Sequence, residues 1–568
     1  MSVIRRPAFI VTILIFCGLG LPAQQADQGP KPSARGARAM ASSSHPLVTK
    51  TMLEVMRNGG NAVDAAITAV ILQPVLEPQM STLAGGMSMM IYEAKTGRVH
   101  YLDAELDHSA KNAPIGFTMA GAPNVPETSG RRIGVPGTVA GLFAASRKFG
   151  TKAWADYFPP AIRLAEAGFP MYSFLYAEMA DAALGRLSFH PSGREEYLPN
   201  GFVPPVGAII KRPRLAQTLG RLAAEGPDFF YKGDWARRFV EAVQKTGGSL
   251  TLEDLAGYEV RWEEPVHTTF KGVEVFGSPP PATAGTLIGL ILNILESYDL
   301  KKMIHFRESP RTLALVREAF GLAETFSETY VRDPRGFGVP LEALLSKPFA
   351  ASLVKLIEAS RPLAENGNTA VGREGEASSP AAASPRDFGY CDTNHLVVVD
   401  PQGNWVTLTH TIYGSTFATG LVVDGINANS GNGFPGSAAG PGRRVISPFP
   451  PTLVMKDGKP WVAIGSPGLS SKAVALTLVN FLGFGLSLEE AVDAPRFQGS
   501  RHGDVCLVES RISERARNEL ASRYGILVQP TAPYNWHFGS IQAVMRDGKT
   551  GELVGVADPR RGGHAEGY

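Results

Sequence analysis

The first half of the chain carries hydrophobic residues at helical spacing. Apolar positions recur every three to four residues, which is typical of helices with one buried face. Asn58-Gly59-Gly60-Asn61 interrupts this pattern, and Asn61 is a candidate N-cap for the helix that follows. Helices are predicted over 48–56, from 62 onward, and over 139–148, 161–167, 215–224, 285–295 and 313–327.

The last third of the chain alternates apolar and polar residues, as β-strands do. Segments 394–400 and 405–413 flank the turn Pro401-Gln402-Gly403-Asn404 and predict a hairpin, with Thr407, Thr409 and Thr411 on one face of its second strand. Strands paired with helices on both sides predict a layered α/β sandwich. Other strands are predicted at 87–92, at 452–455, 461–464 and 541–545, and in a segment that follows the turn at 95–97 and ends at 102. Further helices are predicted at 471–483 and 487–494.

Two segments lack large apolar side chains. Residues 24–45 are rich in Gln, Ala, Gly and Ser and are expected to be disordered. Residues 361–386 consist mainly of Gly, Glu, Ser, Ala and Pro. This second segment could be an idle surface loop, but its position directly before the hairpin favours a flexible end that moves away after a cleavage.

The N-terminus has the pattern of a secretory signal. Arg5 and Arg6 precede an apolar run over 8–21, and Leu21-Pro22-Ala23 offers a small-residue cleavage site. An uncleaved membrane anchor is the alternative, for which the run is short. The sequence therefore predicts a signal peptide over 1–23, a periplasmic or secreted protein, and no stable membrane span after signal removal.

Composition places the chain among ordinary soluble globular proteins. It has 568 residues, a formal net charge of +2, 44% hydrophobic and 19% charged residues. A single core rarely exceeds roughly 300 residues, so two lobes or a chain cut in two are expected. The charge balance predicts no nucleic-acid partner. The histidines, among them His395 and His410, show no ligand spacing, and neither a metal nor a cofactor is expected.

Thr393 stands where the predicted hairpin begins, and this position suggests a nucleophile. Cutting the backbone before Thr393 would free an α-amine beside its hydroxyl, so that one residue would hold both nucleophile and general base. A Thr at a strand start is more often structural. Cys391 is the rival nucleophile, if cleavage followed Tyr390, but its sulfur would lie farther from the strand end.

A glycine-rich turn supplies candidate charge stabilisation. Gly465-Ser466-Pro467-Gly468-Leu469-Ser470 lies between a predicted strand and a predicted helix, where backbone N–H groups can converge as an oxyanion hole. A phosphate-binding loop or a plain turn are the alternatives, and the stretch lacks the Lys of a Walker motif. The chain has neither a G-x-S-x-G elbow nor an H-E-x-x-H motif.

Seven motifs, in order from about residue 36 to the C-terminus, resemble the γ-glutamyltranspeptidase (glutathione hydrolase) family of N-terminal-nucleophile (Ntn) hydrolases. They are Asn58-Gly59-Gly60-Asn61-Ala62-Val63-Asp64-Ala65-Ala66, Val135-Pro136-Gly137-Thr138-Val139-Ala140-Gly141, Pro279-Pro280-Pro281, Thr393-Asn394-His395, Thr411, Gly465-Ser466-Pro467-Gly468 and Asp558-Pro559-Arg560. The resemblance implies a four-layer αββα sandwich made as an inactive precursor. Self-cleavage between Asp392 and Thr393 would give a large subunit, 24–392, and a small catalytic subunit, 393–568.

The resemblance also implies roles for individual residues. Thr393 would be the nucleophile, with Thr411 hydrogen-bonded to it. The N–H groups of Gly468 and Leu469 would form the oxyanion hole, although the family usually has a second Gly where Leu469 stands. Thr393 would attack an amide, form an acyl-enzyme and pass the acyl group to water or an amine acceptor.

Four substrate-binding positions depart from the family pattern. Glu105 stands where an Arg would grip the substrate α-carboxylate, and a carboxylate there is expected to repel that anion. Gly433 stands where an Asp would meet the α-amino group. Of two expected Ser residues, Ser447 remains and the second is Pro448. Tyr413 replaces an Asn, within a one-residue insertion.

The family default is a γ-glutamyl amide such as glutathione as the small-molecule substrate. The alternative is an amidohydrolase or acylase whose acyl group lacks the α-amino acid head, and a third possibility is an inactive binding homologue. Arg443 and Arg444, close to Ser447, could compensate for the missing Arg, but a solvated turn is the favoured interpretation of this pair.

Overall fold

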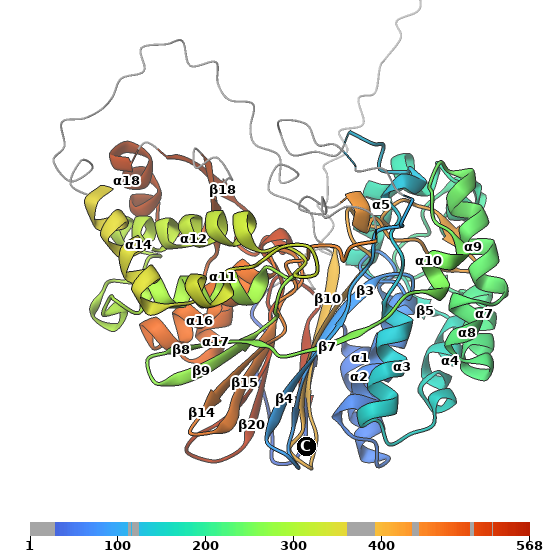
Figure 1. Cartoon of the computed structure of the whole chain (residues 1–568), viewed down its shortest axis with the longest axis horizontal. Helices are drawn as coiled ribbons and strands as arrows, with labels where there is room; N and C mark the ends of the chain where they lie inside the picture. The colour runs from blue at the N-terminus through green and yellow to red at the C-terminus, as the bar shows by residue number, and fades with distance from the viewer. Residues whose placement is uncertain are drawn as a thin grey trace, which may run out of the picture.

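The computed structural model describes residues 29–111, 115, 124–360, 392–433, 442–499, 505–524 and 526–568. Two seven-stranded sheets, each antiparallel throughout, lie face to face between two layers of helices (Figure 1). The predicted αββα sandwich is confirmed. No helix in these described ranges is long and apolar enough to cross a membrane.

Each sheet combines strands from distant parts of the chain. The first runs in the order β1 (Ala34–Gly36), β20 (Leu553–Ala557), β19 (Gln542–Arg546), β15 (Lys459–Gly465), β14 (Thr452–Lys456), β9 (Val273–Gly277) and β8 (Val266–Phe270). The second runs β21 (His564–Gly567), β2 (Met40–Ser43), β10 (Thr393–Val399), β11 (Trp405–Thr411), β3 (Gly86–Glu93), β4 (Arg98–Ala104) and β7 (Arg261–Glu263).

Helices bury the outer face of each sheet. The second sheet is covered by α1 (Pro46–Arg57), α2 (Ala62–Leu76), α3 (Thr138–Phe149), α4 (Pro159–Ala167), α5 (Ser173–Ala182), α7 (Pro213–Glu225), α8 (Pro227–Tyr231) and α9 (Asp234–Lys245). The first is covered by α11 (Ala284–Leu295), α12 (Pro310–Tyr330), α14 (Lys347–Ser360), α16 (Ser471–Leu478), α17 (Leu488–Asp493) and α18 (Glu514–Tyr524). These bounds confirm the predicted helices within a few residues.

The hairpin β10–β11 is central to the second sheet, and its register confirms the threonine face. Thr393 pairs with Thr411, and His395 pairs with Thr409. Alternate side chains point to opposite faces, so Val397 and its neighbours of the same parity enter the core between the sheets, while Leu396 packs under the helices. Thr393 and Thr411 therefore lie together at the end of the two strands.

Local chemistry fixes the start of α2. Asn61 accepts a hydrogen bond from the backbone N–H of Asp64 (2.9 Å), and Asp64 accepts from the N–H of Asn61 (2.8 Å), which is a capping box. The N-cap predicted at Asn61 is confirmed. Such caps contribute about 1 kcal/mol each. Because α2 is buried along its whole length, it anchors the helical layer against the sheet.

The expectation of disorder over 24–45 is wrong for residues 29–45. This segment supplies β1 and β2, and β2 pairs with β10 and β21. Composition misled the prediction because small residues such as Ala41, Ser42 and Ser43 can also be buried in a strand. All three are fully buried here, and the Ser42 hydroxyl donates to the carbonyl of Val556. The predicted signal peptide over 1–23, the flexible segment 361–386 and Cys391 lie outside the described residues.

Candidate active site

Thr393 lies in a closed chain of hydrogen bonds at the start of β10. Its Oγ donates to Oγ of Thr411 (3.1 Å), and that hydroxyl in turn donates to the carbonyl oxygen of Asp392. The backbone N–H of Tyr413 also donates to Thr411 Oγ (2.9 Å). The hydroxyl of Thr411 thus accepts twice and donates once, and it links the candidate nucleophile to the carbonyl that the nucleophile would attack.

The turn after β15 lies beside the start of β10. A β-carbon on Gly465 would lie 2.0 Å from the His395 ring, so only glycine allows this approach. Gly468 has a φ of +70°, which favours glycine as well. Within the described ranges, the N–H groups of Gly468 and Leu469 donate to no protein acceptor. Two free N–H groups on a tight turn are the arrangement that an oxyanion hole requires.

Arg561 connects this turn to Thr393. Its Nη1 donates to the carbonyl oxygen of Thr393 (3.3 Å), and its Nη2 would lie 3.1 Å from a β-carbon on Gly468. The side chain is only 3% exposed and lies over the ring of Trp536, 5.1 Å from its centroid. Sequence reasoning missed this residue, although it directly follows the motif Asp558-Pro559-Arg560.

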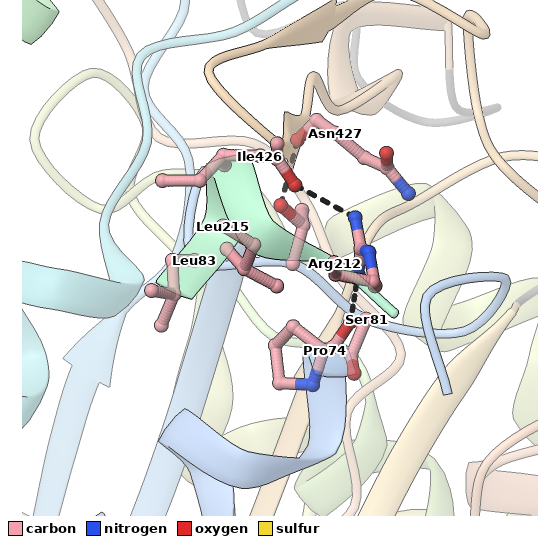
Figure 2. A pocket seen from close by; sticks show the side chains of 9 residues that line it. Pro74, Ser81, Leu83, Arg212, Leu215, Ile426 and Asn427 are labelled. Carbon is pink, nitrogen blue, oxygen red and sulfur yellow. Dashed lines mark hydrogen bonds between the residues drawn. The ribbon is translucent and has the colours of Figure 1, made fainter. Parts of the chain in front are cut away.

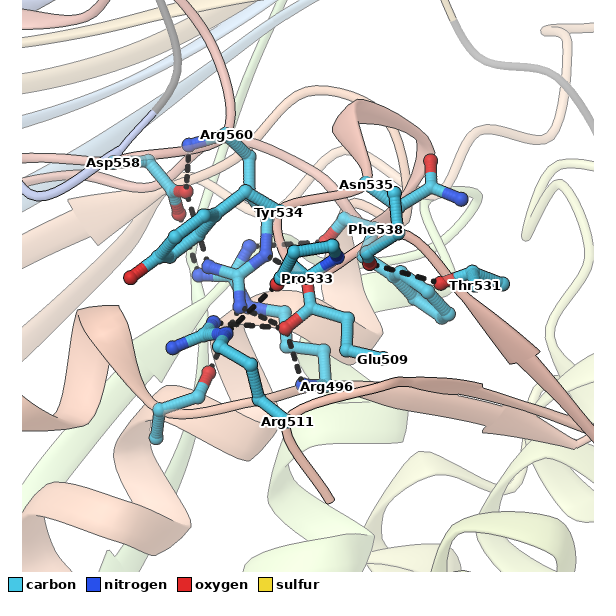
Figure 3. Close-up of polar contacts among 12 residues, drawn as sticks. Arg496, Glu509, Arg511, Thr531, Pro533, Tyr534, Asn535, Phe538, Asp558 and Arg560 are labelled. Atoms are coloured by element: carbon cyan, nitrogen blue, oxygen red, sulfur yellow. Dashed lines mark hydrogen bonds and ion pairs between the residues drawn. The ribbon is translucent and has the colours of Figure 1, made fainter. Parts of the chain in front are cut away.

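A buried ionic network holds the loop that carries Arg561 (Figure 3). Arg560 pairs with Glu509 (2.6 Å) and with Asp558 (3.1 Å), while Arg496 pairs with the other oxygen of Asp558 (2.5 Å). All four side chains are at most 1% exposed. Removing one partner of such a network leaves a buried charge without compensation, which costs about 3–5 kcal/mol. The network therefore fixes the backbone directly before Arg561.

Two of the altered substrate positions, Glu105 and Tyr413, contact each other, and the retained Ser447 also contacts Glu105. The Glu105 carboxylate accepts from the Tyr413 hydroxyl and from Ser447 Oγ (2.9 Å). Glu105 is 1% exposed, and burial, followed by the Asp103 carboxylate, raises the pKa of Glu105 to about 8. The expectation that Glu105 repels a substrate anion needs correction: at neutral pH this carboxyl is largely protonated and is occupied by two protein donors.

Tyr413 adopts an unusual backbone conformation to reach Glu105. Its φ is +63°, a region that costs a bulky residue about 1–3 kcal/mol. The ring also stacks on Phe449, with centroids 5.4 Å apart. Gly86 permits this packing, because a β-carbon there would lie 2.8 Å from Glu105 Oε2 and 3.1 Å from the Tyr413 ring. Glu105, Tyr413, Ser447 and Phe449 thus pack together as a wall, and the backbone N–H of Tyr413 joins this wall to Thr411.

The remaining altered positions are Gly433 and Pro448. A β-carbon on Gly433 would lie 2.9 Å from the Arg132 side chain, so an arginine packs where the family resemblance implies a nearby carboxylate. Arg132 is 8% exposed and donates to the carbonyl of Val125, and sequence reasoning missed it. Pro448 is half-buried, and its carbonyl accepts from Ser470 Oγ (2.9 Å), which joins this wall to the Gly468 turn.

The interpretation of Arg443 and Arg444 as a solvated turn is wrong for Arg444. This guanidinium is fully buried, and its charge is compensated by pairs with Asp103 (3.2 Å) and Asp107 (3.2 Å). It also donates to the backbone carbonyl of Glu105 (2.9 Å). With its charge already matched by two carboxylates, Arg444 supports the wall behind Glu105 and does not replace the missing substrate-binding Arg.

The histidines of the hairpin are structural. His395 contacts Thr409 Oγ1 (2.8 Å) and Thr407 Oγ1 (2.9 Å), and His410 contacts Gln73 (2.6 Å). Burial lowers the pKa of both rings to about 3, so both are neutral. Among the residues that the structure describes, no group of His, Cys, Asp and Glu could hold a metal ion.

A small cavity near α2 is not a second site. Figure 2 shows Arg212 beside it, donating to the carbonyls of Pro74 (2.5 Å) and Gly425 (2.7 Å). Arg212 also pairs with Glu196 and bonds to the Tyr197 hydroxyl. Its charge and its donors are therefore used internally. The cavity needs no polar ligand.

The family model for γ-glutamyltranspeptidases matches residues 48–568, which include every part of this site. The chain belongs to the γ-glutamyltranspeptidase family. It is an enzyme of the glutathione hydrolase-like amidohydrolase type.

The proteins similar to this chain include both glutathione hydrolases and acylases. The chain is 30% identical to a glutathione hydrolase proenzyme of Bacillus subtilis, covering 94% of this chain and 92% of that protein. It is also 30% identical to the acylase ACY 1 proenzyme of a Pseudomonas species (strain SE83), covering 87% and 88%. The crystal structure of a cephalosporin acylase from Bacillus halodurans superposes with a TM-score of 0.79 at 26% identity, covering 95% and 97%.

Replacing Glu105 by Gln should stabilise this γ-glutamyltranspeptidase homologue at high pH. The folded chain keeps a proton on Glu105 up to about pH 8, whereas the unfolded chain releases it near 4.5, so wild-type stability falls as pH rises through this window. Glutamine does not titrate. Thermal unfolding should show the melting temperature of Glu105→Gln above that of the wild type by roughly 3–6 °C at pH 9, with little difference at pH 4. Equal shifts at both pH values would contradict the titration.

Proposed function

We propose that this protein is a self-processing Thr amidohydrolase. It would cleave itself between Asp392 and Thr393 and then transfer the acyl half of a small amide from Thr393 to water or an amine. The hydrogen-bond chain from Thr393 through Thr411 to the Asp392 carbonyl is the observation that carries the proposal. Removal of residues 1–23 and function outside the cytoplasm are part of the same proposal.

Self-cleavage follows from this chain of hydrogen bonds. Thr393 Oγ attacks the carbonyl carbon of Asp392, its proton passes to Thr411 Oγ, and the proton of Thr411 passes to the carbonyl oxygen. The resulting tetrahedral carbon carries a hydroxyl. As the proton of this hydroxyl passes to the amide nitrogen, the C–N bond breaks, which frees the Thr393 α-amine and leaves an ester between Asp392 and Thr393 Oγ. Water then hydrolyses the ester. No separate base is required, because Thr411 relays the proton.

Cleavage creates the base for turnover. The new α-amine of Thr393 titrates near neutral pH and accepts the proton of its own hydroxyl as Oγ attacks a substrate amide. The N–H groups of Gly468 and Leu469 would stabilise the oxyanion. The α-amine then returns the proton to the leaving amine, and the acyl group remains on Thr393 as an ester until water or an acceptor amine releases it.

The acyl group that fits best lacks an α-amino acid head. Glu105 stands in place of an arginine and its carboxyl accepts from Tyr413 and Ser447, so it provides no positive charge for an α-carboxylate. The charge of Arg444 is already neutralised by two aspartates. Gly433 brings no carboxylate to an α-amino group. Simple acyl amides, the class of the acylase alternative, are therefore the leading substrates.

Hydrolysis of γ-glutamyl amides such as glutathione is the second candidate. The match to the γ-glutamyltranspeptidase model over most of the chain and the 30% identity to glutathione hydrolase proenzymes favour it.

A panel of 4-nitroanilides that differ only in the acyl group separates the two candidates. We expect purified, processed protein to release nitroaniline from butyryl- or glutaryl-4-nitroanilide with a kcat/KM at least about tenfold above that for the γ-glutamyl compound, since one lost charged contact costs about 1.5–3 kcal/mol. Thr393→Ala is the control. Preference for the γ-glutamyl anilide would establish the second candidate, and no release from any anilide would contradict both.

A further inference from the structure

We propose that Glu77 is a positioning residue for Thr393, that it acts through Ser44 and Asn394, and that it does so in its protonated form. Glu77, Ser44 and Asn394 form a buried chain of hydrogen bonds on the helix-covered face of β10, opposite the Thr393 hydroxyl. This inference rests on the proposed function and deepens it. It adds a group behind the reacting residue and concerns neither half of the substrate.

Asn394 holds the start of β10. It directly follows Thr393, and its side chain points to the opposite face of the strand. β11 pairs with β10 from Thr393 onward, whereas β2 pairs with it only from Leu396 onward. On that side the Asn394 side chain takes over: its Oδ1 accepts from Ser44 Oγ (2.9 Å), and its Nδ2 donates to Ser81 Oγ (3.1 Å). Self-cleavage would leave Asn394 as the only residue bonded covalently to Thr393, so these two contacts would fix the direction of the new terminus.

The hydroxyl of Ser44 faces two acceptors but carries one proton. Its oxygen lies 2.9 Å from Asn394 Oδ1 and 3.0 Å from Glu77 Oε2. An ionised Glu77 attracts this proton more strongly than the neutral amide oxygen does, because hydrogen bonds to a charged acceptor are the stronger ones. Asn394 Oδ1 then loses its donor. Ionisation of Glu77 therefore releases one of the two contacts that hold Asn394.

A protonated Glu77 satisfies every member of this chain. Its own O–H can donate to Ser44 Oγ, which also accepts from Gln73 Nε2 (3.1 Å) and then directs its single proton to Asn394. Gln73 is held in turn by His410, which pairs with Asn394 across the hairpin: His410 Nε2 lies 2.6 Å from Gln73 Oε1. These five side chains are at most 5% exposed, so a lost donor is not readily replaced by water.

The surroundings of Glu77 keep it protonated below neutral pH. In the described parts of the chain, the titratable groups around it are Arg561, His45, His410 and Tyr172, with Glu178 and Asp392 beside Arg561. Burial raises the pKa of Glu77 to about 7, against the hydrogen bonds that the carboxylate accepts and the charge of Arg561. The rings of His45 and His410 are neutral, because burial lowers their pKa to about 4 and about 3. Glu77 therefore loses its proton in the pH range in which the Thr393 α-amine becomes a free base.

Glu77→Gln separates this role from the titration of the α-amine. Glutamine offers Ser44 an N–H at every pH, whereas the carboxyl offers an O–H only below about pH 7. The measurement is kcat/KM for the 4-nitroanilide that the wild type turns over best, given as the ratio of Glu77→Gln to wild type at the same pH. We expect this ratio to rise from about 1 at pH 6 to roughly 3–10 at pH 9, which is the effect of one hydrogen bond. Both proteins have the same α-amine, so its titration cancels in the ratio.

Glu263→Gln is the matched control. Burial, followed by the Asp103 carboxylate, raises the pKa of Glu263 to about 7 as well, but Glu263 lies in β7, which three strands separate from β10. Its ratio to wild type should therefore be the same at pH 6 and pH 9. Ser44→Ala tests the route, because it removes the donor to Asn394 at every pH. In a Ser44→Ala background, Glu77→Gln should no longer change the pH dependence.

A ratio for Glu77→Gln that is equal at pH 6 and pH 9 would overturn the inference, and so would a rise that persists in the Ser44→Ala background. Turnover of the anilide by the wild type shows in either case that the proposed function stands. If Glu77→Gln is not processed, Ser44→Ala decides the matter: the wild type should exceed it in kcat/KM roughly 3- to 10-fold at pH 6 and equal it at pH 9. The same difference at both pH values rejects the role of Glu77.

Discussion

Thr393→Ala is expected to yield a single uncleaved chain without amidase activity. The substitution removes the hydroxyl that attacks Asp392 during processing and the substrate amide during turnover, so both reactions stop. Loss of a covalent nucleophile lowers kcat by at least about 10⁴-fold. Gel electrophoresis of purified protein measures the first effect, and release of nitroaniline measures the second. Thr393→Ser, which retains a hydroxyl, should still be cleaved, although more slowly.

The fold should survive this change, because only a hydroxyl and a methyl group are removed at a strand end. The circular dichroism spectrum of Thr393→Ala should therefore match that of the wild type. Two bands in Thr393→Ala that disappear in Cys391→Ala would make Cys391 the nucleophile. Two bands in both variants would indicate an outside protease.

Thr411→Val is expected to slow self-cleavage by about 10²–10³-fold. Valine keeps the shape of threonine but lacks the hydroxyl that accepts from Thr393 and donates to the Asp392 carbonyl. Removal of one donor to a developing oxyanion typically costs this factor. The measurement is a time course: precursor purified in the cold is incubated at 25 °C, and the fraction cleaved is followed on gels.

Thr411→Ser is the matched control, since it restores the hydroxyl without the methyl group and should process within about tenfold of the wild type. If Thr411→Val matures as fast as Thr411→Ser, the relay through this hydroxyl is not part of self-cleavage, even where Thr393 remains the nucleophile.

Local pattern was sufficient to predict most of the fold. The alternation around residues 401–404 predicted the hairpin and its threonine face, because side-chain direction in a strand depends only on residue parity. The same reasoning failed for β2. Its short Ala-Ser-Ser run has no apolar period, and it becomes a buried strand only because β10 and β21 pair with it from distant parts of the chain.

The site was partly predictable for the same reason. Thr393 was located by the hairpin and Thr411 was given as its partner by the family resemblance, and the register of the hairpin brings the two together. The protonation state of Glu105 could not be predicted, because its hydrogen-bond partners Tyr413 and Ser447 lie more than 300 residues away in sequence. Arg561 was missed because its importance depends on contacts with Thr393 and Gly468 that only the folded chain creates.

The central claim is that Thr393 becomes the N-terminal residue and carries the acyl group. Intact-mass and peptide-mass spectrometry of wild-type protein, quenched in acid during turnover of its best amide, tests this claim most directly. We predict two polypeptides, the smaller spanning residues 393–568, with the mass of the acyl group added on Thr393. An uncleaved active chain, a cut at another bond, or an acyl group on another residue would contradict the account.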